Sequence, residues 1–458
     1  TALNVANTTI GASGLIFQSV SANGGANNGI VLNNTGTSGG LTVTGTGAAG
    51  SGGTIQNKPI GISLTNTRSP SFSWMQLNNF SDYAIRGTTV TNFTLNNSVI
   101  SGTNGNDPGA DEGSVRFDEL TGSASITNSS ISGTVETQVR ITNTAGTLNR
   151  ITVDNVTFGA MSAATGDNAL SIESLNSAVI NTTVQNSFFT AALGTHINRV
   201  LNGTGASDTV ITGNTISNTG VAAVSGGGAA IRVFGGNNTG INANATFNIA
   251  NNTMRDSRGA ALAVNKLGGT GVFNGTITVN TVGVAGVANS GSSEGSGIFT
   301  LTDGSGPYTA TLTGNTSRQY GNFGIFVQTG GSGVIGNGDM KVTATGNTVA
   351  NPGTLVFAKN GAQLNGGVTP GDTYEVCLTL GGAGALANAI TSTGTDGGTD
   401  FRLRQRQATT VYLPGYVGAN SNDAAVVSFV QGNNGGTPTG SATNTVPTGG
   451  GFLGTCPF

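Results

Sequence analysis

Apolar and polar residues alternate in short runs along most of the chain. The run TVITGNTISNTG (209–220) has close variants in SITNSSISGT (125–134), IANNTMRDSRG (249–259) and TATGNTVANPG (343–353). Alternation with a period of two is typical of a β-strand that buries one face. Gly, Asn and Ser stand between the runs, so we expect short strands joined by turns.

A second phrase, a short apolar strand after small residues, precedes each of these runs. Examples are IRVFGGNN (231–238), LAVNKLGG (262–269), IFTLTDGS (298–305) and IFVQTGGS (325–332). Such phrases start at residues 139, 170, 231, 262, 298 and 325, which indicates a unit of about thirty residues. With three short strands in each unit and about a dozen units, the pattern predicts an all-β parallel β-helix, a solenoid of stacked coils.

An asparagine recurs where the chain turns between two of these strands. Stacked Asn side chains can hydrogen-bond to one another and to the backbone of the turn, and Asn tolerates the left-handed conformation. We therefore predict a structural asparagine ladder rather than a binding site. Its members are Asn128, Asn155, Asn186, Asn214, Asn252, Asn315 and Asn347.

The repeats resemble a known superfold. ITGNTISNTG (211–220) and TATGNTVANPG (343–353) look like repeats of the right-handed parallel β-helices of the pectin-lyase-like superfold. More closely, the chain resembles bacterial β-strand-repeat surface proteins and adhesin-type passenger segments, whose stalks often end in a segment similar to TDFRLRQRQATTVYLPGYVG (399–418). The resemblance covers roughly residues 10–358 as repeats and the last hundred residues as a terminal element. It implies a right-handed solenoid on a bacterial surface, and it specifies fold more strongly than function.

The repeat pattern of the sequence changes near residue 360. We expect residues 1–358 to form the solenoid and residues 359–434 to form a β-rich C-terminal cap, in which 423–434 is a short helix. Residues 435–458 are low in complexity, and we expect a linker-like tail pinned by Cys456. Arg402, Arg404 and Arg406 share one strand face, which is either a solvated or edge-blocking surface or a site for an anionic glycan or partner.

Composition narrows the classes of function. Charged residues make up only 8% of the chain, there are 77 glycines, and the formal net charge is −3. So few basic residues do not form the positively charged surface that nucleic-acid binding requires. No run of apolar residues approaches the roughly 18 that a membrane-spanning helix needs. The opening TALNVANTTIG indicates a segment processed from a longer precursor.

The chain has two cysteines, Cys377 and Cys456. In a reduced cytosolic protein both would remain free thiols. The Lys-poor, Gly-rich composition favours an extracellular protein instead, in which the two form a disulfide.

Candidate chemistry is sparse. Hydrolases of the pectin-lyase-like fold need clustered carboxylates on one strand face, yet no coil carries two acids on alternate positions and neighbouring coils do not align acids one period apart. The single histidine, His196, is expected at the surface in a turn. Trp74 and Tyr83 either fill a wide part of a coil or, if exposed, offer a platform for sugars.

One acidic loop allows a metal alternative. Asp107, Asp111 and Glu112 lie in NGNDPGADEG, where a solvated loop is the first interpretation and weak Ca²⁺ binding the second. We expect no other cofactor.

The sequence therefore favours a non-enzymatic extracellular structural protein: a surface stalk, an adhesin segment or a fibre subunit that self-associates end to end. A glycan-binding or glycan-cleaving protein of the same fold, either a lyase or hydrolase or a tailspike-like protein, is the alternative. An ice-binding protein with Thr-rich faces is a weaker third class, because the Thr residues do not keep a strict register in every coil.

Overall fold

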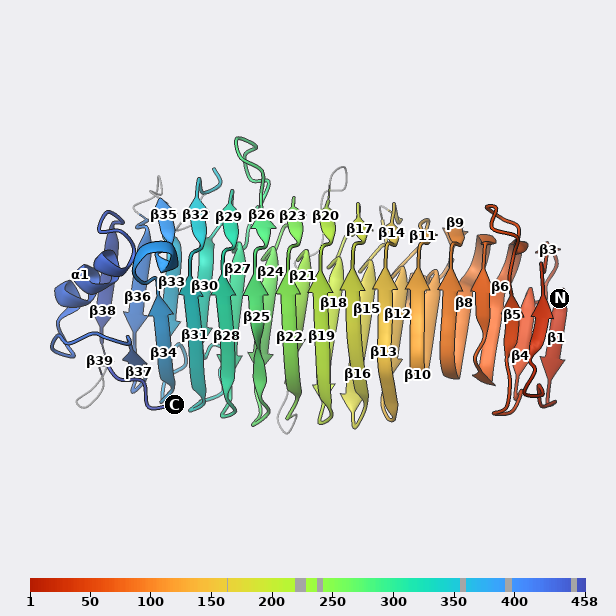
Figure 1. The fold of residues 1–458 in the computed structure, drawn as a ribbon, viewed down its shortest axis with the longest axis horizontal. Helices are drawn as coiled ribbons and strands as arrows, with labels where there is room; N and C mark the ends of the chain where they lie inside the picture. The colour runs from red at the N-terminus through yellow and green to blue at the C-terminus, as the bar shows by residue number, and fades with distance from the viewer. Residues whose placement is uncertain (163, 219–227, 237–241, 355–359, 392–397, 446–450) are drawn as a thin grey trace. The chain divides into compact units, whose positions relative to one another are not determined.

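The computed structural model describes residues 1–162, 164–218, 228–236, 242–354, 360–391, 398–445 and 451–458. These residues form coils of short strands, and each strand pairs in parallel with its counterpart in the next coil (Figure 1). The chain divides into two compact units, residues 1–200 with 210–225 and residues 201–209 with 226–458. The predicted all-β parallel solenoid is confirmed, and we call the three sides of each coil faces 1, 2 and 3 in chain order.

In the first unit, the strands of each face stack coil upon coil. Face 1 holds β1 (Leu3–Ala6), β4 (Ile30–Asn33), β12 (Val139–Asn143) and β15 (Leu170–Asn176). Face 2 holds β2 (Leu15–Phe17), β5 (Leu41–Val43), β7 (Ser71–Ser73), β13 (Thr147–Asp154) and β16 (Val179–Gln185). Face 3 holds β3 (Ala22–Asn23), β9 (Val99–Asn104), β11 (Ser130–Ile131), β14 (Thr157–Phe158), β17 (Phe188–Phe189) and β20 (Thr215–Ser217).

Some strands continue around a corner from one face of the coil to the next, and two strands have residues in both units. Three long strands run from one face to the next: β6 (Gly53–Arg68), β8 (Met75–Asn96) and β10 (Val115–Thr127). β18 (Ile197–Gly203) and β19 (Ala206–Thr212) contribute residues to both units. A short 3₁₀ helix, η1 (Pro108–Ala110), lies in the acidic loop.

The second unit repeats the arrangement. Face 1 holds β21 (Ile231–Gly235), β24 (Leu262–Leu267), β27 (Ile298–Asp303), β30 (Phe323–Thr329), β33 (Asn360–Gly366), β36 (Phe401–Gln405) and β38 (Gly440–Asn444). Face 2 holds β22 (Asn244–Ala250), β25 (Phe273–Thr278), β28 (Tyr308–Thr313), β31 (Asp339–Thr345), β34 (Glu375–Leu380), β37 (Thr410–Tyr412) and β39 (Gly451–Leu453). Face 3 holds β23 (Thr253–Arg255), β26 (Thr281–Val282), β29 (Thr316–Arg318), β32 (Thr348–Ala350) and β35 (Ala389–Thr391).

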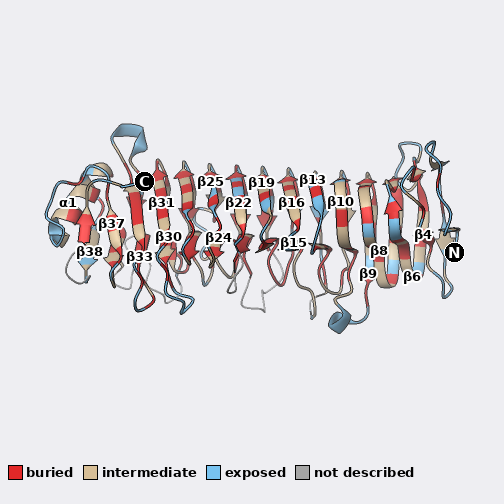
Figure 2. Ribbon diagram, turned by 90° about the horizontal axis from the view of Figure 1, so that it is seen from below, coloured by how far each residue is buried: buried red, intermediate tan, exposed pale blue. Residues whose placement is uncertain are grey.

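The core lies inside the coils, because alternate residues of each strand point inward. On face 1, Phe117 is in register with Ile141, which is in register with Ile172, and each is at most 1% exposed. Figure 2 shows the result as bands along the strands, in which buried residues alternate mostly with residues of intermediate exposure. Equivalent residues also stack between coils: the rings of Phe158 and Phe189 lie 4.5 Å apart and nearly parallel. Each coil therefore buries its apolar residues against the next one, as expected for a solenoid.

The turns between strands select Asn and Gly because their backbone is left-handed there. Asn128 and Asn155 have φ of 50° and 54°. Gly133 has φ of 75°, and a Cβ atom at that position would lie 1.4 Å from the carbonyl oxygen of Gly102 in the preceding coil. Only a residue without a side chain fits that turn.

The C-terminal region differs from the expected division at residue 359. The strands β33 and β34 pair in register with β30 and β31, so the solenoid continues through the segment expected to be a separate cap. The expected helix is confirmed as α1 (Asp423–Asn433), the one α-helix among the described residues. The tail expected to be linker-like adds two further strands, since β38 pairs with β36 and β39 with β37. Strand pairing extends this far because the edge of each coil presents free backbone groups to the next.

Candidate functional site

Three arginines stack on the outer side of face 1 in the first unit. Arg86 of β8 is in register with Arg116 of β10, which is in register with Arg140 of β12. Neighbouring coils are about 4.8 Å apart, so three like charges at this spacing repel one another unless anions separate them.

Carboxylates occupy the spaces between these guanidinium groups. Asp118 pairs with Arg86, and its other oxygen lies 3.5 Å from Arg116 Nε. Asp111 accepts a hydrogen bond of 2.6 Å from Arg116 and pairs with Arg140 as well. The arginine–acid network, as we call it, consists of Arg86, Arg116, Arg140, Asp111, Asp118 and Glu173.

The network is partly exposed and electrically balanced. Its side chains keep between 15% and 32% of their surface exposed, and its three positive charges face three negative ones. Single ion pairs at this exposure stabilise a protein by about 0–1 kcal/mol each, although a network holds its members in place more firmly. The network therefore orders the surface of face 1 more than it stabilises the fold.

Two further carboxyl groups lie beside the network, on the loops that lead into β12 and β15. The amide of Asp167 donates to the carbonyl oxygen of Glu136 at 3.4 Å. Burial raises the pKa of the Glu136 carboxyl to about 7, and the negative charges of Asp167 and Asp111 add to this effect. Burial also raises the pKa of Asp167, against the lowering effect of its hydrogen bonds with Thr137 and the backbone.

This acid pair corrects the expectation that neighbouring coils do not align acids. Asp111, Glu136 and Asp167 come from successive coils: the negative charges of Asp111 and Asp167 raise the pKa of Glu136, and that of Asp111 raises the pKa of Asp167. Their spacing of roughly one unit is present in the sequence, but Asp111 lies in the acidic loop and the other two lie in turns, where strand alternation gives no register. A carboxyl with a pKa near 7 can give or take a proton at neutral pH.

The acidic loop does not gather its carboxylates around a metal. Asp107 Oδ1 accepts from the amide of Gly109, and Glu112 Oε2 accepts from the amides of Asn106 and Asp107. Asp111 turns to the arginines instead. Within the part of the chain that the structure describes, no group of three His, Cys, Asp or Glu residues is placed to hold a metal ion.

The asparagine ladder of the second unit is buried and continuous. The Oδ1 atom of Asn315 accepts from both the backbone amide and the Nδ2 of Asn280, each at 3.0 Å, while Asn315 Nδ2 donates to Asn347 at 3.0 Å and to the carbonyl of Ile277 at 2.8 Å. The buried asparagine ladder, as we call it, comprises Asn252, Asn280, Asn315, Asn347, Asn388 and Asn434, which are at most 5% exposed.

The seven predicted asparagines therefore occupy two positions of the turn rather than one. Asn128, Asn155 and Asn186 are left-handed and exposed, and Asn155 donates to Asn128 at 2.9 Å. Asn214, in the first unit, sits one residue later in its turn, where it is 1% exposed and donates to the carbonyl of Val184. Asn252, Asn315 and Asn347 share that later position.

The signal that separates the two positions is the residue before each asparagine. Gly213, Gly314 and Gly346 take the left-handed position and leave the next residue to the buried ladder. Sequence reasoning also missed three rungs. Asn280, Asn388 and Asn434 follow Val, Ala and Asn respectively, so the Gly-Asn phrase does not mark them.

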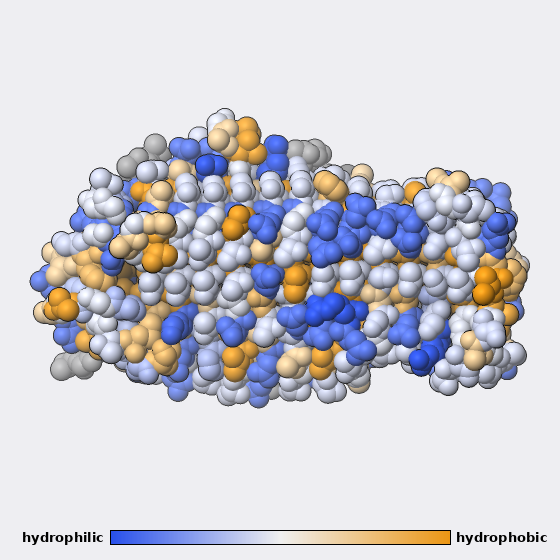
Figure 3. Space-filling view, viewed as in Figure 1, coloured by the Kyte–Doolittle hydropathy of each residue, from blue (hydrophilic) through white to orange (hydrophobic). Residues whose placement is uncertain are grey.

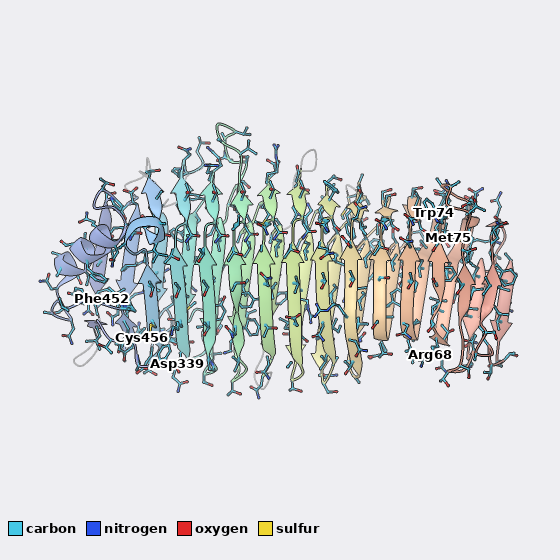
Figure 4. The ribbon with its side chains drawn as sticks, in the orientation of Figure 1. Arg68, Trp74, Met75, Asp339, Phe452 and Cys456 are labelled. Atoms are coloured by element: carbon cyan, nitrogen blue, oxygen red, sulfur yellow. A yellow bond between two sulfur atoms is a disulfide. The ribbon has the colours of Figure 1, made fainter. Side chains whose placement is uncertain are left out.

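The two cysteines are joined, as predicted. Cys377 of β34 and Cys456 form a disulfide with Cα atoms 5.7 Å apart, closing a separation of 79 residues. Figure 4 shows Cys456 near Asp339 at the ends of the face 2 strands. Lys341 Nζ also donates to the carbonyl oxygen of Phe458 at 3.2 Å, so the end of the chain is held against face 2.

His196 and its neighbour Arg199 belong to the core. His196 is 1% exposed and its ring meets Phe189 edge-on, which corrects its expected place at the surface. Arg199 is equally buried and donates to Ser174 Oγ and to the carbonyl of Ile180, and burial lowers its pKa to about 9. Both side chains are part of the packing.

The remaining candidates lie at intermediate exposure. Trp74, labelled at a corner in Figure 4, has φ of 61°, and it and Tyr83 are half-buried. Arg402 and Arg404 lie on the outer side of β36, opposite Ser441 and Thr443 of β38, and Arg406 follows the strand.

Comparisons with protein-family models, with curated proteins and with solved structures find no match to this chain. Among the described residues, no helix is long and apolar enough to cross a membrane. The inference about function therefore depends on the geometry of the chain itself.

Proposed function

We propose that this chain is a non-enzymatic structural protein of an extracellular surface, a stalk or adhesin segment, or a fibre subunit. The observation that carries the proposal is the buried asparagine ladder, whose rungs link successive coils of the second unit. Each rung satisfies backbone groups of a turn inside the coil, so a coil cannot open without exposing unpaired polar groups. Such a stack resists local unfolding, which is what an exposed stalk requires.

The disulfide supports an oxidising location. Cys377–Cys456 clasps the last strands at the C-terminal end of the solenoid. Disulfides persist outside the cytosol and are rare within it, so the bond fits a secreted or surface-bound protein.

We further propose that the first coil pairs with a second copy of the chain. Leu3 and Val5 of β1 point inward but are only half-buried, while Ile16 and Phe17 of β2 are 69% and 38% exposed. β1 pairs with β4 on one side, and among the described residues its other edge has no strand. A strand edge with exposed apolar residues beside it can template another strand, and head-to-tail stacking of copies would bury those residues.

Resistance to proteases tests the structural proposal. The oxidised protein is incubated with proteinase K and followed by mass spectrometry. We expect cleavage within the outer loops while the stacked strands stay associated and intact. Rapid digestion of the face 1 strands in the folded protein would contradict the proposal.

A second function is favoured by the pair Glu136 and Asp167. The backbone amide of Asp167 donates to the carbonyl oxygen of Glu136 at 3.4 Å, so these two residues of adjacent coils are neighbours, and burial raises the pKa of both carboxyl groups. An acid and a base from two carboxyl groups are the minimum for cleavage of a glycosidic bond. Release of reducing ends from a polysaccharide panel, lost in both Glu136→Gln and Asp167→Asn, would replace the structural proposal by a glycosidase. The absence of turnover by the wild-type protein would remove this second function.

A further inference from the structure

A groove lies between α1 and the outer side of face 2 in the second unit. It encloses a cavity of about 360 Å³. Thr343 and Thr345 of β31 and Thr379 of β34 line one side of it, and Phe429 of α1 and Leu386 of η2 (Gly384–Leu386) line the other. In the view of Figure 3, apolar side chains gather at this end of the molecule.

The groove is preformed, because both of its walls are anchored to the solenoid. Asn434, which caps the C-terminus of α1, is the last rung of the buried asparagine ladder and donates to the carbonyl of Leu380 at 3.0 Å. The amide of Gly382 donates to the carbonyl of Asn433 at 2.8 Å, and that of Gly346 to the carbonyl of Leu386 at 3.0 Å. A ligand that enters such a groove does not have to order it first.

The aromatic wall is also held in one orientation. The ring of Phe429 meets the ring of Tyr416 edge-on, with centroids 5.6 Å apart. Tyr416 is only 5% exposed and donates from its hydroxyl to the carbonyl of Ala419 at 2.9 Å. Phe429 therefore presents an apolar surface that is fixed in place but remains partly accessible.

The lining is neutral and combines hydroxyl groups with apolar side chains. Its residues are Thr343, Thr345, Leu378, Thr379, Leu380, Gly381, Gly382, Leu386, Leu413, Pro414, Phe429, Val430 and Asn433, and none of them is ionisable. The hydroxyl groups come from β31 and β34, and Phe429 of α1 and Leu386 of η2 add apolar side chains to the same cavity. This combination suits a neutral, rigid ligand that carries hydroxyl groups on one side and C–H groups on the other, and the volume is within the usual range for small-molecule sites.

The hydroxyl side continues beyond the groove along face 2. Thr343 is in register with Thr379 on one side and with Thr311 of β28 on the other, and Thr311 is in register with Thr276 of β25. Thr345 continues in the same way to Thr313. Figure 3 shows rows of residues of intermediate hydropathy crossing these strands. A chain of hydroxylated rings that leaves the groove meets further hydroxyl groups at a spacing of about 4.8 Å.

We propose that this groove binds a neutral pyranose residue of a glycan chain, with the sugar's C–H face against Phe429 and its hydroxyl groups towards Thr343 and Thr379. The site adds a ligand to the proposed structural protein but does not depend on that function, nor on the acid pair of the first unit. It uses no charged group, so acidic glycans are not its ligands.

Calorimetric titration with defined oligosaccharides tests the proposal. The probes are cellohexaose, maltohexaose, xylohexaose and, as an acidic comparison, hexagalacturonic acid. We expect at least one neutral hexasaccharide to bind and the acidic one not to bind. For the bound sugar, Phe429→Ala is expected to weaken binding by about tenfold or more, since it removes the aromatic wall.

Thr379→Val separates recognition from folding, because it keeps the shape of the side chain and removes only the hydroxyl. We expect binding to weaken by about threefold to tenfold. Thr152→Val, on the same face but in the first unit, is the matched control and should leave the affinity unchanged. The proposal is overturned if no neutral hexasaccharide binds the folded wild-type protein, or if binding survives both groove variants.

Discussion

Asparagine 315 shows how a single side chain joins three coils. Its amide group accepts from Asn280 and donates to Asn347 and to Ile277 of an earlier strand, all within the core. Removing it takes a partner from two buried donors of Asn280 and from two buried acceptors, Asn347 Oδ1 and the carbonyl of Ile277, and each unsatisfied group costs about 1–3 kcal/mol. The cost at this position is therefore larger than that of an exposed asparagine in the neighbouring turn position.

Asn315→Ala tests this difference. We expect it to lower the local free energy of unfolding around β26, β28 and β29 by about 2–4 kcal/mol, measured by native-state hydrogen exchange. Asn155→Ala, in the exposed ladder of the first unit, is the control and is expected to cost less than about 1 kcal/mol. Equal effects of the two variants would refute the distinction between the two ladders.

Glu136 gives the first unit a dependence on pH. Its pKa is raised from 4.5 to about 7, so the protonated form is favoured in the folded chain. The stability that this group contributes is fully present below about pH 4.5 and is lost as the pH rises through about 7. Because the side chain is partly exposed, we expect the loss to be no more than about 1 kcal/mol.

Glu136→Gln mimics the protonated carboxyl and removes this dependence. The thermal midpoint of the variant, measured from pH 5 to pH 8, is expected to fall less with pH than that of the wild type. Asp167→Asn removes a neighbouring negative charge and should lower the pKa of Glu136 in an NMR titration. Identical pH profiles for wild type and Glu136→Gln would show that another group controls the slope.

At the scale of elements, regular repetition made most of the solenoid predictable. The sequence pattern predicts apolar phrases that start at residues 139, 170, 231, 262, 298 and 325. The first five of these are the first residues of β12, β15, β21, β24 and β27, and residue 325 lies within β30. These strands are short, apolar and preceded by small residues, so the local pattern is sufficient to place them. The helix expected at residues 423–434 is likewise present as α1.

The long strands could not be predicted in the same way. β8 turns corners at Asn79, Thr89 and Asn92, which have positive φ. Thr is not a residue that signals a left-handed turn, and the conformation at Thr89 depends on the coils stacked on each side. The burial of His196 and the proximity of Glu136 to Asp167 also depend on how neighbouring coils stack. The sequence of a single coil does not show which residues of the next coil will lie beside it.

The disulfide belongs to the elements that it connects, β34 and the segment after β39. Cys456→Ser removes the cross-link between two residues that are 79 positions apart in the sequence. We expect the free energy of unfolding of the C-terminal coils to fall by about 2–4 kcal/mol. Thermal unfolding of the variant should match that of the wild type treated with reductant. A wild-type midpoint that does not respond to reductant would contradict the role of this bond as a clasp.

At the scale of the whole molecule, the proposed self-assembly depends on the edge of β1 that points away from β4. The amide of Asn7 donates to Asn33, and alternate amides of a parallel strand face the same neighbour. The amide of Asn4 therefore points away from β4. Asn4→Pro removes this donor without breaking a bond to β4, and Asn4→Ala is the control that keeps it.

Negative-stain electron microscopy of the purified native protein tests the central claim most directly. We predict filaments with a regular axial repeat for the wild type and for Asn4→Ala, and single particles for Asn4→Pro, because the proposed stacking uses the amide of Asn4 that points away from β4. Single particles for all three proteins at every concentration would contradict self-assembly and with it the proposed fibre-forming role.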